Sequence, residues 1–575
     1  MNSRYTKLLY ALGAATMTIT ALAAPKPDTP LEWTTVINNN DLIPPLEQRT
    51  FNSYNQPSVN TEGLVVMRAR SRGGPPLGPA THGIYTRDMS IADSEIVRIL
   101  DRTTPVPQPN NLGSKFVETP SFPRIDMHSA TIATRGNHSP VHRYLLDDGS
   151  ETRAGTTGIY TNVSDVLTAG AAKLGHVPDE ENNKYFVPEF EGFGIAFEVF
   201  PGSPSVTNGN TIVFKGNYTA EGAARTGVYY RELAAEPWGG TSQSVLIANN
   251  AHTLIPGTTV MFGSTAPPNA ADNQAVFAGF DNEQAPTLGG IYLAPLQYQP
   301  PLTTIVKIGD RVPGQAGGAR FNTFGESIAF DGRFVGFWGA WGEDSRTVKL
   351  YCKEEGNKDR IAYCNQALYC AATDETLGEP SSICDDETDP RFGKSCYTTR
   401  QVPEYQGIFV HDTVNGKTSL IAQSDSEFED FLFWNYSGRV PCSSHGHGAE
   451  GGEDDGESIR WRSSAFVAVS TGTEAKLNTA FKAKSGRLRN GIYENQIDGI
   501  YLRTGSNQNS IVTVVDTTMD GQVLDPEAPP DSKITELGLE REGLRGRWLT
   551  INASMEVEGG EEEDGMAGVY ITQIE

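Results

Sequence analysis

Apolar and polar residues alternate in short runs along almost the whole chain. Typical runs, such as "TTIVKIGD" and "ADNQAVFAGF", are rich in Val, Ile, Tyr and Phe and are bounded by Gly, Pro and Asn. A period of two is the pattern of a half-buried β-strand. Long segments with apolar residues at i, i+3, i+4 and i+7 are missing, so the pattern predicts an all-β protein.

One short phrase recurs at intervals and divides the chain into units. It consists of Gly, then Ile or Val, then Tyr or Phe, and its copies begin at Gly83, Gly158, Gly227, Gly290, Gly407, Gly499 and Gly568. A further match at Gly491 is too close to Gly499 to be a separate unit. Each copy follows a polar turn and an apolar strand, and most precede another strand. Four strands per unit, in seven units, predict a seven-bladed β-propeller.

The two ends of the chain supply matching pieces of one blade. Few residues follow the seventh phrase at Gly568, so the last unit lacks its fourth strand. The segment Glu32 to Pro44, "EWTTVINNNDLIP", is similar to the strand and turn "TTIVKIGDRVPG". We therefore expect the N-terminal strand to pair into the last blade, which closes the ring and removes two sheet edges.

The first residues have the three-part pattern of a secretory signal peptide. Arg4 and Lys7 precede an apolar run from Leu8 to about Leu22, and small residues surround a cleavage point after Ala23. No other stretch reaches about 18 apolar residues, the length of a membrane span. We expect residues 1–23 to be removed and residues 24–575 to form a single propeller domain that is secreted, either extracellular or periplasmic.

An insertion interrupts the repeat between the fourth and fifth phrases. We place it at residues 344–404, and it contains Cys352, Cys364, Cys370, Cys384 and Cys396. In an exported protein an even number of cysteines, completed by Cys442, favours disulfides that stabilise a loop without its own core. A zinc site that uses Cys442, His445 and His447 is the alternative, although the chain has no CxxC pair.

The net charge of −25 argues against nucleic-acid binding. Two Gly-rich acidic runs, Glu450 to Glu457 and Glu556 to Asp564, are solvated loops or, alternatively, a structural calcium site. Any polyanionic ligand requires a local basic patch in so acidic a protein. We expect no membrane partner and a monomer.

Such a patch lies in the second and third units. Between Ser121 and Leu146 the sequence has a single acidic residue, Asp126. Its basic residues are Arg124, His128, Arg135, His138, His142 and Arg143. The third unit adds Lys215, Asn217, Tyr218, Arg225, Tyr230 and Arg231. If neighbouring blades converge on the central channel, His, Tyr and Arg groups meet at one site.

This combination suits β-elimination in a polysaccharide that contains uronic acid. The reaction needs a cation on the sugar carboxylate, a base for the C5 proton and an acid for the leaving oxygen. Arg pairs with a carboxylate bidentately, and His titrates near pH 6.5. Tyr suits the acid, because acting as a base requires depressing its pKa by about three units, roughly 4 kcal/mol.

The phrases "FNSYNQPSVNTEGLVVMRARSRGG", "NHSPVHRY" and "TGVYYR" resemble those of the ulvan lyases of the seven-bladed propeller type. The resemblance implies cleavage of ulvan, a sulfated polysaccharide, without a redox cofactor. It implies catalytic roles for His128, His142, Tyr218 and Arg231, with His138 and Arg225 as alternatives for the first histidine and the arginine. We prefer His128 because it lies on an apparent strand. Substrate contacts are expected from Arg124, His138, Arg143, Arg225 and Tyr230. A structural calcium or zinc ion is compatible with the family, but its ligands are unassigned.

Other interpretations compete with the lyase. A secreted propeller that binds glycan or protein without chemistry explains the same cluster as a ligand patch, and a hydrolase lacks visible paired carboxylates. Four other histidines are expected to be hydrogen-bonded packing residues: His82, His176, His252 and His411. The tyrosines of the repeated phrase, such as Tyr160, Tyr229 and Tyr292, are expected in the blade core.

Overall fold

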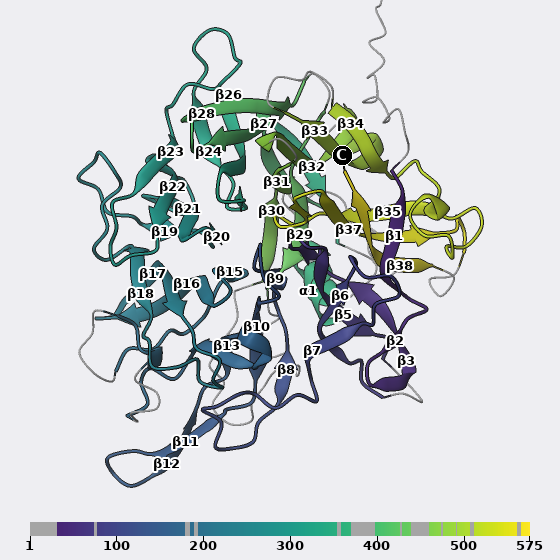
Figure 1. Cartoon of the computed structure of the whole chain (residues 1–575). Helices are drawn as coiled ribbons and strands as arrows, with labels where there is room; N and C mark the ends of the chain where they lie inside the picture. Colours follow the sequence, from purple (N-terminus) through teal and green to yellow (C-terminus); the bar gives the residue numbers. More distant parts are fainter. Residues whose placement is uncertain are drawn as a thin grey trace, which may run out of the picture.

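The structure is a seven-bladed β-propeller, as the repeat predicts. This computed structural model describes residues 31–73, 78–178, 184–188, 194–352, 358–369, 397–425, 428–438, 459–472, 475–489, 492–505, 511–560 and 565–574. Seven antiparallel sheets surround a central axis, which Figure 1 views end on. The predicted signal peptide lies outside the described residues.

The first four blades follow one another along the chain. The first contains β2 (Leu42–Ile43), β3 (Leu46–Tyr54), β4 (Ser58–Val59), β5 (Leu64–Ser71), β6 (His82–Asp88) and β7 (Val97–Asp101). The second contains β8 (Phe116–Glu118), β9 (Arg124–Ile125), β10 (Ile132–His138), β13 (Thr157–Thr161) and β14 (Thr168–Ala172). The third contains β15 (Ser205–Thr207), β16 (Thr211–Ala220), β17 (Ala223–Glu232) and β18 (Val245–Asn249). The fourth contains β19 (Ser264–Thr265), β20 (Asn269–Ala271), β21 (Gln274–Phe280), β22 (Gly289–Pro295) and β23 (Thr303–Lys307).

The remaining blades carry the additions to the propeller. The fifth contains β24 (Phe321–Phe324), β25 (Ala329–Phe330), β26 (Phe334–Leu350), β27 (Thr398–Asp412) and β28 (Lys417–Gln423). The sixth contains β31 (Val467–Thr471), β32 (Leu477–Arg489), β33 (Ile492–Thr504) and β34 (Ile511–Asp516). The seventh contains β35 (Lys533–Gly538), β36 (Leu544–Arg545), β37 (Trp548–Glu556), β38 (Met566–Gln573) and β1 (Trp33–Asn38). Outside the blades lie α1 (Lys358–Tyr369) and two hairpins, β11 (His142–Leu145) with β12 (Glu151–Ala154) and β29 (Phe433–Ser437) with β30 (Arg460–Ser464).

The N-terminal strand closes the ring, which confirms the prediction from the two chain ends. β1 pairs antiparallel with β38, so that Trp33 lies opposite Thr572 and Asn38 opposite Gly568. Val36 and Ile37 are fully buried there. The seventh blade therefore joins both ends of the described chain and leaves no unpaired edge at β38.

The repeated phrase has a physical origin in the packing between strands. Its tyrosines are buried between blades, with Tyr160, Tyr229 and Tyr292 each at most 2% exposed, which confirms their expected place in the core. Its glycines lie where the outer strand passes closely. A side-chain Cβ at Gly290 would come within 2.0 Å of the Val306 carbonyl oxygen, so no larger residue fits.

The short inner strands form a ring around the axis. Each contacts the next, and the ring consists of β4, β9, β15, β20, β25, β31 and β36. Polar turns after inner strands bond to the next blade. After β9, Asp126 accepts from the Gly209 amide at 3.0 Å, and after β25, Asp331 accepts from the Thr471 amide at 2.5 Å. These turns explain the polar residues before each apolar strand. We call their side of the propeller the turn face.

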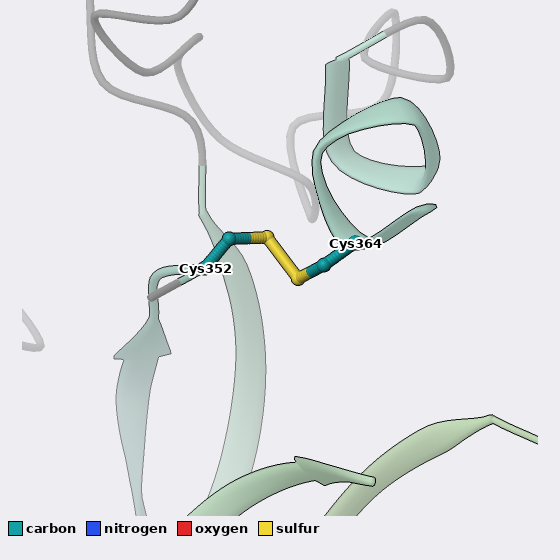
Figure 2. Close-up of a disulfide and its surroundings, with 2 residues drawn as sticks. All are labelled: Cys352 and Cys364. Atoms are coloured by element: carbon teal, nitrogen blue, oxygen red, sulfur yellow. A yellow bond between two sulfur atoms is a disulfide. The ribbon is translucent and has the colours of Figure 1, made fainter. Parts of the chain in front are cut away.

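The opposite side, which we call the insertion face, carries the hairpin β11–β12 and the insertion of the fifth blade. A disulfide joins Cys352, at the end of β26, to Cys364 on α1 (Figure 2). This bond confirms the predicted use of cysteines for these two residues. Cys370, Cys384, Cys396 and Cys442 lie outside the described residues, as do His445 and His447 and the acidic run Glu450 to Glu457.

Candidate functional site

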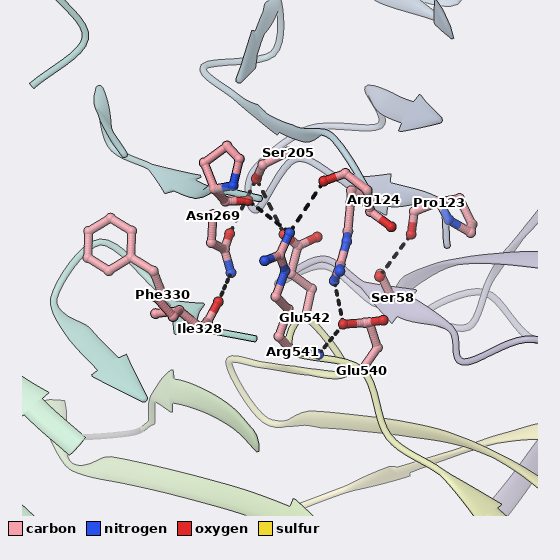
Figure 3. A network of polar contacts seen from close by, with 12 residues as sticks. Ser58, Pro123, Arg124, Ser205, Asn269, Ile328, Phe330, Glu540, Arg541 and Glu542 are labelled. Atoms are coloured by element: carbon pink, nitrogen blue, oxygen red, sulfur yellow. Dashed lines mark hydrogen bonds and ion pairs between the residues drawn. The ribbon is translucent and has the colours of Figure 1, made fainter. Parts of the chain in front are cut away.

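The centre of the ring is filled by a short segment of the seventh blade. Residues 539–543 connect β35 to β36, and their charged side chains turn toward the axis, where Figure 3 shows them. Arg541 and Glu542 are 3% and 2% exposed. With Arg545, the segment reaches all six other blades through contacts with Val59, Arg124, Ser205, Pro268, Phe330 and Val469. We call Glu540, Arg541, Glu542 and Arg545 the hub.

Arg124, a predicted substrate contact, belongs to this network instead of an open surface. Its Nη1 lies 2.8 Å from Glu540 Oε1, and both side chains are 4% exposed (Figure 3). A polysaccharide does not reach a cation that is buried and already paired. The predicted role of Arg124 is therefore corrected to a structural ion pair between the second blade and the hub.

The hub contains several buried arginines close to one another. Burial, and then the positive charge of Arg124, lower the pKa of Arg541 to about 9. Its guanidinium donates 2.8 Å to the Pro268 carbonyl, and Arg545 donates 3.0 Å to the Phe330 carbonyl. Glu540 and Glu542 oppose the shift. The arginines therefore serve as crosslinks between inner strands.

The structure does not bring the four predicted catalytic residues together. On the β16–β17 ladder Arg231 pairs with Ile212 near the turn face, whereas Tyr218 pairs with Arg225 near the insertion face. Six residues of extended strand span about 20 Å. Likewise His128 precedes β10 and His142 follows it. His128 and Arg231 thus lie toward one face and His142 and Tyr218 toward the other, too far apart for one sugar ring.

His128 is also not on a strand, contrary to our expectation. It is an exposed residue of the turn between β9 and β10, with its amide bonded to Asp126 at 2.8 Å. Its Nδ1 lies 3.3 Å from Thr61 Oγ1 of the first blade. The apolar residues on either side produced the appearance of a continuous strand, but Asp126 turns the chain there.

Arg231 is completely buried and is held by backbone carbonyls. Its Nε donates to Ser242 at 2.9 Å, and its Nη1 donates to Gly170 at 2.7 Å. Further bonds reach the carbonyls of Ala169, Trp238 and Gly240, and the guanidinium lies 5.3 Å from the centre of the Tyr185 ring. Arg231 therefore ties the β17–β18 connection to β14 of the second blade and presents no free edge to a carboxylate.

The two residues toward the insertion face are also largely covered. Tyr218 is 2% exposed and packs in the core of the third blade, where its ring centroid lies 6.3 Å from that of Phe197. His142 is 5% exposed and pairs with Ala154 at the start of the β11–β12 hairpin. Catalytic roles for this pair remain a prediction.

His138, predicted as a substrate contact, is a buried bridge within the second blade. Its Nδ1–H donates to the Ser139 carbonyl at 2.9 Å, because a carbonyl oxygen only accepts. The neutral ring then accepts from the Tyr160 hydroxyl through Nε2 at 2.5 Å. Burial lowers the pKa of His138 from 6.5 to about 4. His138 is therefore neutral at neutral pH and serves packing.

This lowered pKa predicts acid sensitivity. Below about pH 6.5 the unfolded chain protonates His138, whereas the folded protein resists until about pH 4, so the free energy of unfolding falls as the pH falls through this window. The expected fall in the free energy of unfolding over this window is about 3 kcal/mol. His138→Gln should flatten the pH dependence of urea unfolding between pH 6.5 and 4, while His128→Gln, at an exposed site, should not. Equal slopes for wild type and His138→Gln would contradict this account.

The other predicted contacts lie apart from one another. Arg143 is exposed on the β11–β12 hairpin, 3.6 Å from Glu151, and Figure 1 shows this hairpin projecting beyond the ring. Arg225 and Tyr230 lie at opposite ends of β17 and are partly exposed. Burial, and then Glu232, raise the pKa of Tyr230 above its usual value. Arg225 therefore lies toward the insertion face and Tyr230 toward the turn face.

The structure reveals a cluster that the sequence analysis missed, on the first blade at the insertion face. His82 on β6 pairs with Arg70 on β5, so their side chains share one face of the sheet. Burial, followed by the positive charges of Arg68, Arg102 and Arg70, lowers the pKa of His82 to about 3. Its Nδ1 is buried and has no hydrogen-bond partner among the described residues. We call His82, Arg68, Arg70 and Arg102 the rim cluster.

Two arginines of the rim cluster, Arg70 and Arg102, are exposed, and Arg68 is fixed in place. The guanidinium of Arg68 donates to Asn55 at 2.7 Å and to Thr119 at 3.2 Å. The sequence contained a sign of this cluster, since "RARSR" puts arginines at alternate positions, and Arg68 and Arg70 therefore lie on one face of β5. His82 was assigned to packing because it stands alone in the sequence.

Two of the hollows that described residues line open on the turn face. One, of about 520 Å³, lies between the second and third blades and is lined by Ser129, Asn162, Asp165 and Asn208, among others. The other, of about 350 Å³, lies between the fifth and sixth blades beside the ion pair of Arg333 with Asp412. Neither contains a histidine, so neither matches the predicted acid–base chemistry.

A metal site was also considered. In the described ranges no three His, Cys, Asp or Glu side chains gather as metal ligands. The residues proposed for zinc lie outside these ranges, so the expectation of a structural ion stays a prediction. No helix within the described ranges is long and apolar enough to cross a membrane.

No family model matches the chain, and no curated protein sequence is similar to it. Among solved structures, an alpha-L-arabinofuranosidase from Podospora anserina in complex with cellotriose has 8% sequence identity and a TM-score of 0.23, over 71% of this chain and 96% of that chain. A Trypanosoma rangeli sialidase has 9% identity and a TM-score of 0.29, over 84% of this chain and 58% of that chain. A glycosyl hydrolase from Bacteroides ovatus has 13% identity and a TM-score of 0.21, over 55% and 93%. TM-scores this low carry no argument about function, and the seven-bladed propeller is established by this chain's own sheets.

Proposed function

We propose that this protein is an exported enzyme that acts on an anionic polysaccharide, with ulvan as the substrate and β-elimination next to the uronic acid as the reaction. The observation that supports the proposal is the rim cluster. In a chain with a net charge of −25, three arginines surround one neutral histidine at an accessible edge of the first blade. An acidic protein gathers cations in this way where a negatively charged ligand offsets their repulsion.

The rim cluster has groups for two steps of the elimination. Arg70 and Arg102 are exposed and suit a uronate carboxylate, which one guanidinium binds bidentately. That pairing makes the C5 proton more acidic. A bound carboxylate also neutralises part of the arginine charge, so it raises the pKa of His82 toward the range of a general base. His82 then accepts the C5 proton, and the glycosidic oxygen leaves with a proton from solvent or from a neighbouring acid.

The residues implied by the family resemblance are the alternative place for this chemistry. His142 and Tyr218 lie toward the same face, in the second and third blades. Tyr218 would act as the acid and His142 as the base. Their burial requires that substrate binding opens the surface, whereas the exposed arginines of the rim cluster need no such change.

A propeller that binds an anionic glycan without chemistry is the second candidate. It is favoured by the burial of Arg231 and by the separation of His128 from Tyr218, because the four residues implied by the resemblance then do not meet in one place. In this case the rim cluster recognises the polymer and nothing is cleaved.

Absorbance near 235 nm during incubation with ulvan tests the proposal, because β-elimination creates an unsaturated uronate. We expect a rise for the wild type that His82→Gln lowers at least a hundredfold, in line with the loss of a general base. His142→Gln and Tyr218→Phe report on the alternative place, and Arg320→Gln, at an exposed arginine outside the rim cluster, serves as the control.

The activities of these variants separate the candidate functions and the candidate sites. Loss of product only in His142→Gln and Tyr218→Phe would move the reaction to the second and third blades. No product from ulvan or from other uronic-acid polysaccharides, with binding retained, would overturn the lyase and leave the binding propeller.

A further inference from the structure

The larger of the two hollows on the turn face is a preformed cavity between the second and third blades. Its volume of about 520 Å³ lies within the range of small-ligand sites. Two hydrogen bonds join the blades there: the Thr131 hydroxyl donates to the Gly209 carbonyl at 2.6 Å, and the Gly209 amide donates to Asp126 at 3.0 Å. The Asn162 side chain accepts from the Ile132 amide at 2.6 Å. These bonds hold the walls of the hollow in place before any ligand binds.

Ser164 and Asp165, in the turn between β13 and β14, have an unusual backbone conformation at this hollow. Their φ angles are 48° and 65°, in the left-handed region, which Asp tolerates but Ser seldom adopts. Residues held in this way cluster at ligand sites. Both side chains are exposed, and neither forms a hydrogen bond to any residue that the structure describes. The turn therefore presents a hydroxyl and a carboxylate to the hollow.

The groups that line the hollow match the hydroxyl groups of a sugar. A carboxylate only accepts hydrogen bonds, so Asp165 fits two adjacent sugar hydroxyls, each of which donates. The hydroxyls of Ser129 and Ser164 donate or accept, as a sugar hydroxyl does. Ala130 and Ala235, which are exposed, offer apolar contact to the C–H groups of a sugar ring. The hollow thus combines polar partners with a small apolar surface.

The charge of the hollow indicates which kind of sugar fits. Among the described residues that line it, Asp165 is the one charged side chain. A uronate or a sulfate group would meet this carboxylate with a charge of the same sign, which opposes binding. The rim cluster on the insertion face has the opposite character, with three arginines around His82. The two faces of the propeller therefore suit different sugars.

We propose that this hollow binds a neutral sugar, with Asp165 accepting from two adjacent hydroxyls and with Ser129 and Ser164 as further hydrogen-bond partners. We call it the sugar subsite. Because it lies on the turn face, away from the rim cluster, it binds its ligand whether or not a polymer is cleaved elsewhere. The sugar is a free saccharide or a neutral residue of a longer chain, and the length of the probe distinguishes these sources.

Saturation-transfer NMR titrations of the whole protein test the sugar subsite without relying on activity. The probes are the methyl glycosides of glucose, galactose, mannose, xylose and rhamnose, and methyl glucuronide, which differs from methyl glucoside in its carboxylate. We expect at least one neutral glycoside to bind, and methyl glucuronide to bind at least tenfold more weakly than the best of them. A linear tetramer of the best sugar that binds more tightly indicates a residue of a chain, whereas equal affinity indicates a free saccharide.

Asp165→Asn removes the charge but keeps the size of the side chain and its tolerance of a positive φ. We expect it to weaken binding of the neutral glycoside about tenfold, because hydrogen bonds to a charged group are the stronger ones, and to remove the preference over methyl glucuronide. The matched control is Asp531→Asn, at another exposed aspartate with a φ of 65°, which should bind like the wild type. Thermal unfolding of each variant checks that the fold is kept.

The outcomes distinguish this inference from the proposed function. If no neutral glycoside bound, or if Asp165→Asn bound as tightly as the wild type, the sugar subsite would be overturned even if ulvan is cleaved. Tighter binding of methyl glucuronide than of every neutral glycoside would also overturn it. Binding of a neutral glycoside that Asp165→Asn weakens, without any product at 235 nm, would support the sugar subsite and overturn the lyase.

Discussion

Arg124→Met is expected to lower the free energy of unfolding by about 3–5 kcal/mol, because it breaks a buried ion pair and leaves one partner uncompensated. Glu540 would remain at the centre of the ring, 3% exposed, without the guanidinium that lies 2.8 Å away in the wild type. The effect should be large because Glu540 belongs to the hub, where one segment contacts every other blade.

Urea unfolding followed by tryptophan fluorescence measures this change. The matched control is Arg143→Met, which breaks an ion pair to Glu151 between side chains that are 53% and 46% exposed. An exposed pair contributes about 1 kcal/mol or less, so this control should unfold nearly like the wild type. If both variants lost the same small amount, the hub would not stabilise the ring as we describe.

Arg231→Met is expected to have an even larger effect and to prevent stable folding or lower the free energy of unfolding by more than about 4 kcal/mol. The wild-type guanidinium satisfies five backbone carbonyls, those of Ala169, Gly170, Trp238, Gly240 and Ser242. A buried acceptor left without a partner costs about 1–3 kcal/mol. Arg231→Lys should recover only part of the loss, because an ammonium group cannot place its donors in the planar fork that reaches these carbonyls.

This prediction separates structure from catalysis at a residue that the family resemblance presents as catalytic. Thermal unfolding and activity at 235 nm are measured on the same preparations. If Arg231→Met unfolded at the wild-type temperature but formed no product, the result would support a role of Arg231 in binding the carboxylate. Our structural assignment would then be wrong. A control is Arg225→Met, on the same strand but partly exposed, which should keep the wild-type stability.

The fold was predictable because the same local sequence pattern recurs in every blade. Each blade needs a glycine where the outer strand passes, as at Gly290, and an aromatic ring between sheets, as at Tyr292, so seven similar packing problems left seven similar phrases. Closure was also predictable, since Trp33 to Asn38 has the pattern of an outer strand and the last unit lacked one.

The candidate site was less predictable, because proximity along the chain does not decide which face a side chain occupies. His128, His138 and His142 are close in sequence, yet a turn, a buried hydrogen bond and a hairpin place them in three environments. A run of histidines and arginines shows that these residues are close in sequence. The strand register and the turns decide which face and which environment each side chain occupies.

The sequence by itself determined the all-β class, the seven units, the closure by the N-terminal strand and the acidic surface with local basic segments. Tertiary structure alone decided that Arg124 and Arg231 are internal crosslinks, and that His82 lies among the positive charges of Arg68, Arg70 and Arg102. The physical reason is range. Strand patterns and turns follow from interactions between near neighbours, whereas the burial and pairing of a charge depend on which distant segments the closed ring brings beside it.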